Sequence, residues 1–99
     1  MYFITCFLFK PEEKHPIQSS RCFGYFKDFE TCDKALKKNS CDMHEYLYNY
    51  AIVEYIEEGI HSIAIGEHRQ FYQYDFDKQG FYPCDCPEYC NHIVNFAIG

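Results

Sequence analysis

The chain has 99 residues, with 9 Lys and Arg against 15 Asp and Glu, so its formal net charge is −6 when the histidines are neutral. That length suits a single domain, which we expect to span residues 1–99. The 10 Phe and 10 Tyr supply large apolar side chains for one core, so folding is expected and disorder is not. The negative charge opposes a sequence-independent grip on nucleic-acid phosphates, because such binding requires Lys and Arg.

The apolar segment 1–9 is too short for a membrane-spanning helix, and no basic residue precedes it as in a signal peptide. We therefore expect no membrane association and a cytoplasmic location, which is the host bacterial cytoplasm if a phage encodes the protein. The chain has seven cysteines. Because an odd number cannot all pair in disulfides, this count agrees with a reducing compartment. Most of these cysteines are interpreted as small buried hydrophobic residues.

Two strands are predicted at the start of the chain. Tyr2–Phe9 is a continuous run of β-branched and aromatic residues, which is typical of a strand buried on both faces. Lys10–Pro16 is polar and ends this strand with a loop. Arg21–Phe26 predicts a second, shorter strand, in which Gly24 marks a bulge or a close backbone approach.

An amphipathic helix of about three turns is predicted next, over residues 28–39. Its apolar face carries Phe29, Cys32, Ala35 and Leu36. Asp28 suits the N-cap position, and Asn39 can end the helix in the left-handed region. Pairs with i,i+4 spacing add to its stability: Glu30/Lys34 and Asp33/Lys37.

A long central strand is predicted over Tyr46–Ile56, because this segment is rich in Tyr, Ile and Val. Alternation along a strand places every second side chain on the same face. We therefore expect a row of tyrosines on one face of this strand, formed by Tyr46, Tyr48 and Tyr50.

The rest of the chain predicts a hairpin and a short helical turn. Phe71–Phe76, followed by a turn that closes at Gly80, has the pattern of a β-hairpin. Pro87 to about His92 predicts a helical turn, since Pro suits the first helical position. Ile93–Ile98 is expected to form a last strand, and Ile60–Ile65 fits either a short strand or a loop.

These elements predict one α+β domain. Its sheet is mostly antiparallel, and the main helix, about residues 28–39, packs on one face. A short helical turn follows near the C-terminal end of the sequence. Neither repeats nor linkers interrupt this pattern.

The densest group of candidate metal ligands is Cys84, Cys86, Cys90 and His92. Thiolate sulfur and imidazole nitrogen are the ligands that tetrahedral zinc prefers. Structural zinc sites usually take two short-spaced pairs from separate elements, whereas here one tight turn would supply all four ligands. We therefore expect no cofactor, and a small zinc-binding domain is the alternative.

No catalytic residues are assigned from the sequence. Cys41, His44 and Glu45 have the residue types of a Cys–His catalytic site, but their spacing does not fix the geometry that catalysis needs. The glycines are isolated, so there is no glycine-rich phosphate loop. We expect a protein that is not an enzyme.

Two forms of recognition fit the composition. Carboxylates gathered on one face could stand in for phosphates and plug the nucleic-acid groove of a nuclease. The candidates for this role are Asp75, Asp77, Asp85 and Glu88. Alternatively, cations and aromatic rings could hold the phosphate and base of a nucleotide signal. The candidates for that role are Arg21, Arg69, Lys78, Tyr72 and Tyr74.

A further set of segments carries a family resemblance: Arg21–Glu30, Asn39–Tyr46, Tyr48–Glu54, Glu58–Ile60, Phe71–Tyr74, Pro87–Glu88 and Ile93–Gly99. In these segments the chain resembles a family of small uncharacterised proteins from Gram-positive bacteria and their phages. No activity or catalytic residue is assigned to that family, so the resemblance transfers no site. It implies an accessory factor of a phage or mobile element that disables a bacterial defence system.

The sequence therefore predicts a non-enzymatic interaction protein, most concretely a phage-type inhibitor of a bacterial defence system. Its partner is expected to be a host protein or a nucleotide signal. Self-association through a sheet edge is left open, and so is the formation of a homo-oligomer.

Overall fold

The computed structural model describes residues 1–58, 69–93 and 96–97, without the side chains of Asn91 and His92. These residues form a five-stranded sheet of order β2-β1-β3-β4-β5, in which every neighbouring pair is antiparallel. The strands are β1 (Tyr2–Phe9), β2 (Ile17–Phe26), β3 (Tyr50–Tyr55), β4 (Arg69–Asp75) and β5 (Gly80–Cys84). The helical elements are α1 (Phe29–Lys37) and the short 3-10 turns η1 (Ser40–Asp42) and η3 (Glu88–His92). The predicted α+β class is confirmed.

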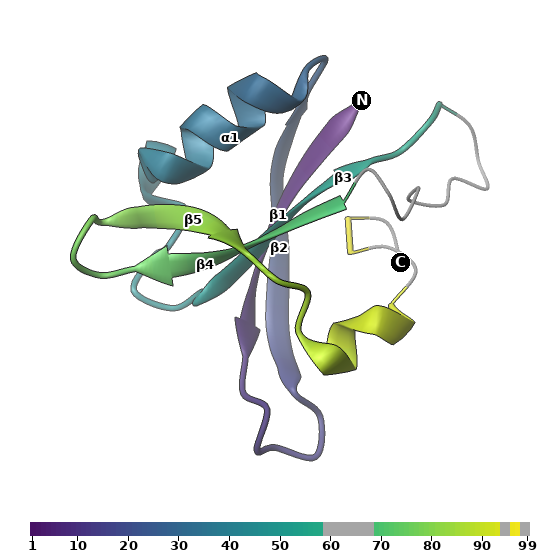
Figure 1. The fold of residues 1–99 in the computed structure, drawn as a ribbon, viewed down its shortest axis with the longest axis vertical. Helices are drawn as coiled ribbons and strands as arrows, with labels where there is room; N and C mark the ends of the chain where they lie inside the picture. The colour runs from purple at the N-terminus through teal and green to yellow at the C-terminus, as the bar shows by residue number, and fades with distance from the viewer. Residues whose placement is uncertain (59–68, 94–95, 98–99) are drawn as a thin grey trace.

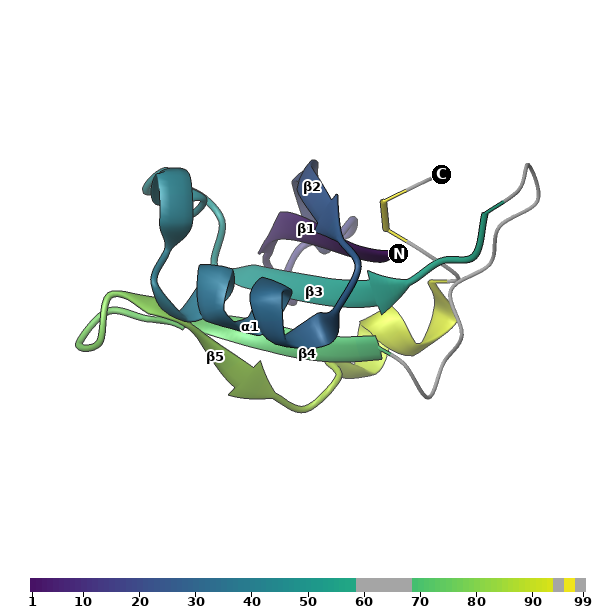
Figure 2. The same ribbon diagram turned by 90° about the horizontal axis from the view of Figure 1, so that it is seen from above.

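The sheet is strongly twisted and is covered on both faces, with α1 lying over one of them (Figure 2). Figure 1 shows β1 and β2 running steeply while β4 and β5 run across them. Helix α1 packs on one face, where its Cys32 and Leu36 join a core with Val53 and Tyr72. The other face holds a second core that contains Phe7, Ile52, Phe71, Cys90 of η3 and Phe96. Strand β1 lies between the two cores, which explains its continuous apolar sequence.

The helix follows its sequence signals closely. The Asp28 side chain accepts a hydrogen bond from the Thr31 backbone N–H at 2.8 Å, as an N-cap residue should. The predicted ion pair between Lys37 and Asp33 forms at 2.9 Å. Asn39 ends this region with φ 50° and ψ 47°, in the left-handed conformation expected of it.

The predicted central strand is too long at its start, and the predicted row of tyrosines is wrong. Strand β3 begins at Tyr50. Before it, the Asn49 side chain accepts a hydrogen bond from the Phe9 N–H at 2.7 Å and donates one to the Phe9 carbonyl at 2.8 Å. These side-chain bonds replace the backbone bonds that would extend the β1–β3 pairing. Tyr46 lies in a turn and is 92% exposed, whereas Tyr48 is buried in the core under α1.

Other boundaries also differ from the sequence prediction. Strand β2 extends from Ile17 and not from Arg21, and its register against β1 shifts beside Gly24, where a bulge was expected. Phe76 lies in the turn after β4. The predicted last strand is wrong in its described part, since Ile93, Phe96 and Ala97 lie in no strand, and Ile60–Ile65 lies outside the described residues.

Gly80 marks a close approach between the end of α1 and the start of β5. A Cβ atom built on Gly80 would overlap the backbone carbonyl of Lys37. Gly24 differs, because a Cβ there meets no atom within 4 Å. The absence of a side chain at Gly80 therefore lets the helix end lie directly on the hairpin.

We expect Gly80→Ala to lower the free energy of unfolding by about 1–3 kcal/mol, because a backbone carbonyl cannot move aside as a flexible side chain can. Urea unfolding followed by circular dichroism measures this change. Gly24→Ala is the matched control, and we expect it to change stability by less than about 0.5 kcal/mol. Equal losses in the two variants would contradict the proposed close approach.

Candidate functional site: an aromatic pocket beside His44

A pocket of about 300 Å³ opens where three segments meet: the end of α1, the loop that follows it, and the β4–β5 hairpin. It is lined by Lys38, Asn39, Asp42, His44, Tyr46, Tyr74, Phe76 and Gln79. Its volume lies at the lower end of the range for small-molecule sites. Aromatic rings from the loop and the hairpin form much of its wall.

The centre of this wall is a stacked pair of rings. The imidazole of His44 lies parallel to the phenol ring of Tyr74, with centroids 3.7 Å apart and an interplanar angle of 3°. Phe76 meets both rings edge-on, at 5.0 Å from Tyr74 and 5.5 Å from His44. The buried ring of Phe81 contacts the pair from the core. The stacked pair is therefore held from the protein side.

Two of the pocket's rings face solvent. His44 is only 6% exposed, but Phe76 is 72% exposed and Tyr46 is 92% exposed. Tyr46 lies 5.9 Å from His44, tilted by 57°. Single exposed apolar residues are ordinary on protein surfaces. Two exposed aromatic rings on one pocket form a patch that a flat apolar ligand could cover.

The loop between α1 and β3 adopts an unusual backbone. Residues with positive φ and a side chain are uncommon, yet this loop contains a group of them: Asn39, Cys41, Asp42, Glu45 and Tyr46. Across the pocket, Gln79 also has a positive φ of 56°. Such conformations cost free energy and often occur at functional sites. Here they concentrate around the pocket.

Asn39 holds this loop in place. Its side-chain amide donates to the Asp42 carboxylate at 3.0 Å and accepts a bond from the His44 backbone N–H at 2.9 Å. The Asn39 side chain thus bonds both the carboxylate of Asp42 and the backbone of His44. Lys38, which is exposed, supplies positive charge at the rim.

Burial lowers the pKa of His44 below its ordinary value of 6.5, and the nearby Asp42 carboxylate opposes this shift only in part. The imidazole is therefore neutral at pH 7, and its ring stacks on Tyr74 without carrying a charge. Burial also raises the pKa of the Tyr74 phenol, so that ring is neutral as well. The stacked pair of His44 and Tyr74 in the pocket wall is therefore uncharged at pH 7.

The structure does not bring the predicted acidic residues together. Asp75 lies at the end of β4, where its carboxylate accepts bonds from the backbone N–H groups of Asp77 and Lys78 at 2.9 and 3.1 Å. Asp85 follows the far end of β5 and Glu88 begins η3. The length of β5, roughly 16 Å for five residues in a strand, separates these two pairs.

The residues predicted for nucleotide binding are also dispersed, and only Tyr74 lies in the pocket. Tyr72 is fully buried under α1, where its hydroxyl donates to Asp33 at 2.7 Å. Arg21 pairs with Glu45 at 3.0 Å on β2. Lys78 lies 4.5 Å from the Tyr82 ring in the hairpin. Arg69 belongs to the opposite face of the sheet, beside Glu54.

The cysteine cluster shows no metal geometry in the part of the chain that the structure describes. Cys90 is buried, Cys84 is half-buried and Cys86 is exposed. Burial raises the pKa of Cys84 to about 11 and that of Cys90 to about 12, which favours the thiol over the thiolate that zinc binds. The His92 side chain lies outside the described residues, so the zinc site stays a prediction.

A Cys–His catalytic pair is also not formed. Cys41 is exposed in η1, and no hydrogen bond joins it to His44 within the described residues. His44 instead stacks on Tyr74. From the sequence, His44 is a candidate together with Cys41 and Glu45, whereas several residues of this pocket are not predicted as site residues: Lys38, Asn39, Phe76 and Gln79. The one local signal was the cluster of polar and helix-ending residues around Asn39.

Comparison with known proteins identifies no relative of this chain. No family model, no curated protein and no solved structure matches this chain. In the described residues, no helix is long and apolar enough to cross a membrane.

The buried His44 predicts a pH dependence of stability. Because its pKa is lowered in the folded protein, the unfolded chain takes up the proton first as the pH falls. The stabilisation is complete above about pH 6.5 and is lost progressively below it. We expect His44→Gln to reduce the fall in unfolding free energy between about pH 7.5 and 5.5. His15→Gln, on an exposed loop residue, is the control and should leave the fall unchanged.

Proposed function

We propose that this protein is a non-enzymatic capture protein that holds the base of a nucleotide in the pocket beside His44. The observation that carries the proposal is the pair of exposed rings, Phe76 and Tyr46, beside the stacked pair of His44 and Tyr74. Proteins bind single bases by stacking them on aromatic side chains. The aromatic rings in the wall of this pocket suit that mode of binding.

Size and polar groups favour one base over a larger ligand. A volume of about 300 Å³ accommodates one flat heterocycle, with the sugar and phosphate left at the rim. Lys38 is the cation at that rim, and the Gln79 amide can reach the polar edge of a base. Asp42 already accepts a bond from Asn39, so its charge is partly compensated.

The alternative of a nucleic-acid mimic receives less support from the geometry. Mimicry requires carboxylates gathered on one face, and Asp75 and Asp77 lie at the opposite end of β5 from Asp85 and Glu88. Of the residues predicted to bind a nucleotide, Tyr74 lies in the pocket beside His44, and the other residues of that pocket support the same mode of binding. We therefore favour capture of a nucleotide.

The family resemblance gives this activity a biological setting. An accessory factor of a phage that binds a nucleotide would lower the free concentration of a signal on which a bacterial defence system depends. Such capture needs no cofactor and no covalent step. We accordingly place the proposed activity in the cytoplasm of a host bacterium.

The test is a binding series measured by calorimetry and by thermal shift, with adenosine, AMP, GMP and a cyclic dinucleotide. We expect Phe76→Ala to weaken binding about 5- to 150-fold, because base stacking on an aromatic ring is worth about 1–3 kcal/mol. Tyr46→Ala should act in the same direction. Tyr89→Ala removes an exposed ring outside the pocket and serves as the matched control.

Two outcomes would contradict the proposal. The first is that no member of the series binds while both pocket variants remain folded by circular dichroism. The second is that tetramethylammonium binds and the nucleotides do not, because an aromatic pocket with a carboxylate also suits a quaternary cation. In either case the base-stacking role of Phe76 is wrong.

A further inference from the structure

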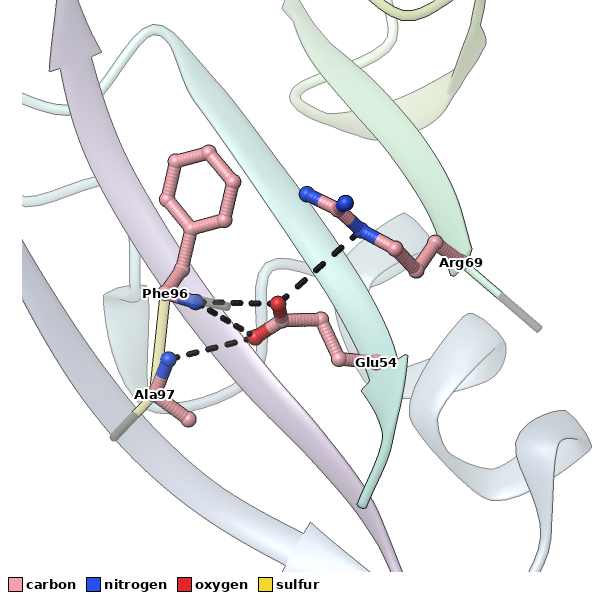
Figure 3. A network of polar contacts seen from close by, with 4 residues as sticks. All are labelled: Glu54, Arg69, Phe96 and Ala97. Atoms are coloured by element: carbon pink, nitrogen blue, oxygen red, sulfur yellow. Dashed lines mark hydrogen bonds and ion pairs between the residues drawn. The ribbon is translucent and has the colours of Figure 1, made fainter. Parts of the chain in front are cut away.

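A second constellation lies on the sheet face opposite α1, and it is built around Glu54. This residue is on the central strand β3 and is 0% exposed. Its carboxylate accepts bonds from the Phe96 backbone N–H at 2.9 and 3.1 Å and from the Ala97 N–H at 3.1 Å. Figure 3 shows the two carboxylate oxygens directed at these consecutive N–H groups.

The Phe96 side chain also contacts this face of the sheet. Its ring stacks on Phe7 at 4.9 Å and meets Phe71 edge-on at 5.9 Å. The Arg69 guanidinium lies 5.7 Å from the Phe96 ring and 5.5 Å from the Phe71 ring. One aromatic anchor and two backbone donors therefore connect Phe96 and Ala97 to the sheet.

This contact has the form of peptide recognition and not of a sheet ladder. Phe96 and Ala97 lie in no strand, and their N–H groups donate to a side chain. Proteins that bind peptides combine backbone hydrogen bonds with a pocket for a side chain. A fully buried carboxylate is costly compared with an apolar residue of similar volume. Its presence is accounted for if Glu54 recognises peptide N–H groups.

Phe96 and Ala97 bond the Glu54 carboxylate but give no hydrogen-bond acceptor to the neighbouring Arg69 guanidinium. In the part of the chain that the structure describes, the Nε and Nη2 atoms of Arg69 are buried and have no hydrogen-bond partner. Nε lies 4.0 Å from the nearer oxygen of Glu54, which is an ion-pair distance and not a hydrogen bond. Buried donors without acceptors cost free energy. A peptide that adds a carbonyl oxygen near Arg69 would satisfy them.

We propose that the recess formed by Phe7, Glu54, Arg69 and Phe71 is a peptide-binding site. Its resident occupant is the Phe96–Ala97 segment of the chain itself. Its external ligand is a peptide segment in which an aromatic residue precedes a small one, so that the ring enters the recess and consecutive N–H groups reach Glu54. This site is separate from the pocket beside His44 and does not depend on the nucleotide proposal.

The experiment uses the full chain with Phe96→Ala, which removes the resident anchor, and a synthetic peptide Ile-Val-Asn-Phe-Ala-Ile-Gly that copies residues 93–99. We expect the peptide to bind this variant at least tenfold more tightly than it binds the unmodified chain, because the resident segment no longer competes. The same peptide with Phe replaced by Ala should not bind. Adding Glu54→Gln to the variant should weaken binding at least tenfold, whereas adding Tyr89→Ala should not.

Absence of peptide binding to a folded Phe96→Ala chain overturns the proposal, and so does binding that Glu54→Gln leaves unchanged. Equal binding of free phenylalanine and of the peptide also overturns it, since the ligand would then be an amino acid. If Phe96→Ala does not fold, amide hydrogen exchange is measured on the unmodified chain. Saturating peptide should then speed exchange at the Phe96 and Ala97 N–H groups, and unchanged exchange overturns the proposal.

Discussion

The contact of the end of α1 with the start of β5 is the constraint on which the pocket depends. Gly80 allows it, because only a residue without a side chain leaves room for the Lys37 carbonyl. The chain then leaves the helix directly over the hairpin, so Lys38 and Asn39 stand beside Gln79. The Asn39 side chain holds the loop after α1 in place through its hydrogen bonds with Asp42 and His44. The pocket is therefore a result of how one helix ends.

Local signals in the sequence predicted the elements whose causes are local. The helix has its cap at Asp28 and its left-handed end at Asn39, and both are set by neighbouring residues. The start of β3 was mispredicted for the opposite reason. The Asn49 side chain takes the place of a ladder by pairing with Phe9, which lies 40 residues away in the sequence. Strand propensity cannot detect such a contact, so Tyr46–Asn49 was assigned to the strand.

The candidate site was less predictable than the fold, because its residues come from distant parts of the chain. Tyr74 was selected for its aromatic character, but the stacking of its ring on His44 arises only from the tertiary structure. Glu54 lies inside the predicted central strand, and nothing nearby in the sequence indicates that it meets Phe96. Similarly, the four predicted acidic residues are close in the sequence, but a strand keeps Asp77 and Asp85 apart.

Burial also divides the seven cysteines into two chemical groups. Cys6, Cys32 and Cys90 are enclosed and Cys84 is half-buried, and burial raises the pKa of each thiol. The exposed thiols are Cys22, Cys41 and Cys86, which come from β2, from η1 and from the segment before η3. An alkylating reagent in water would reach these three first. They are ready attachment points for fluorophores or spin labels on three separate parts of the surface.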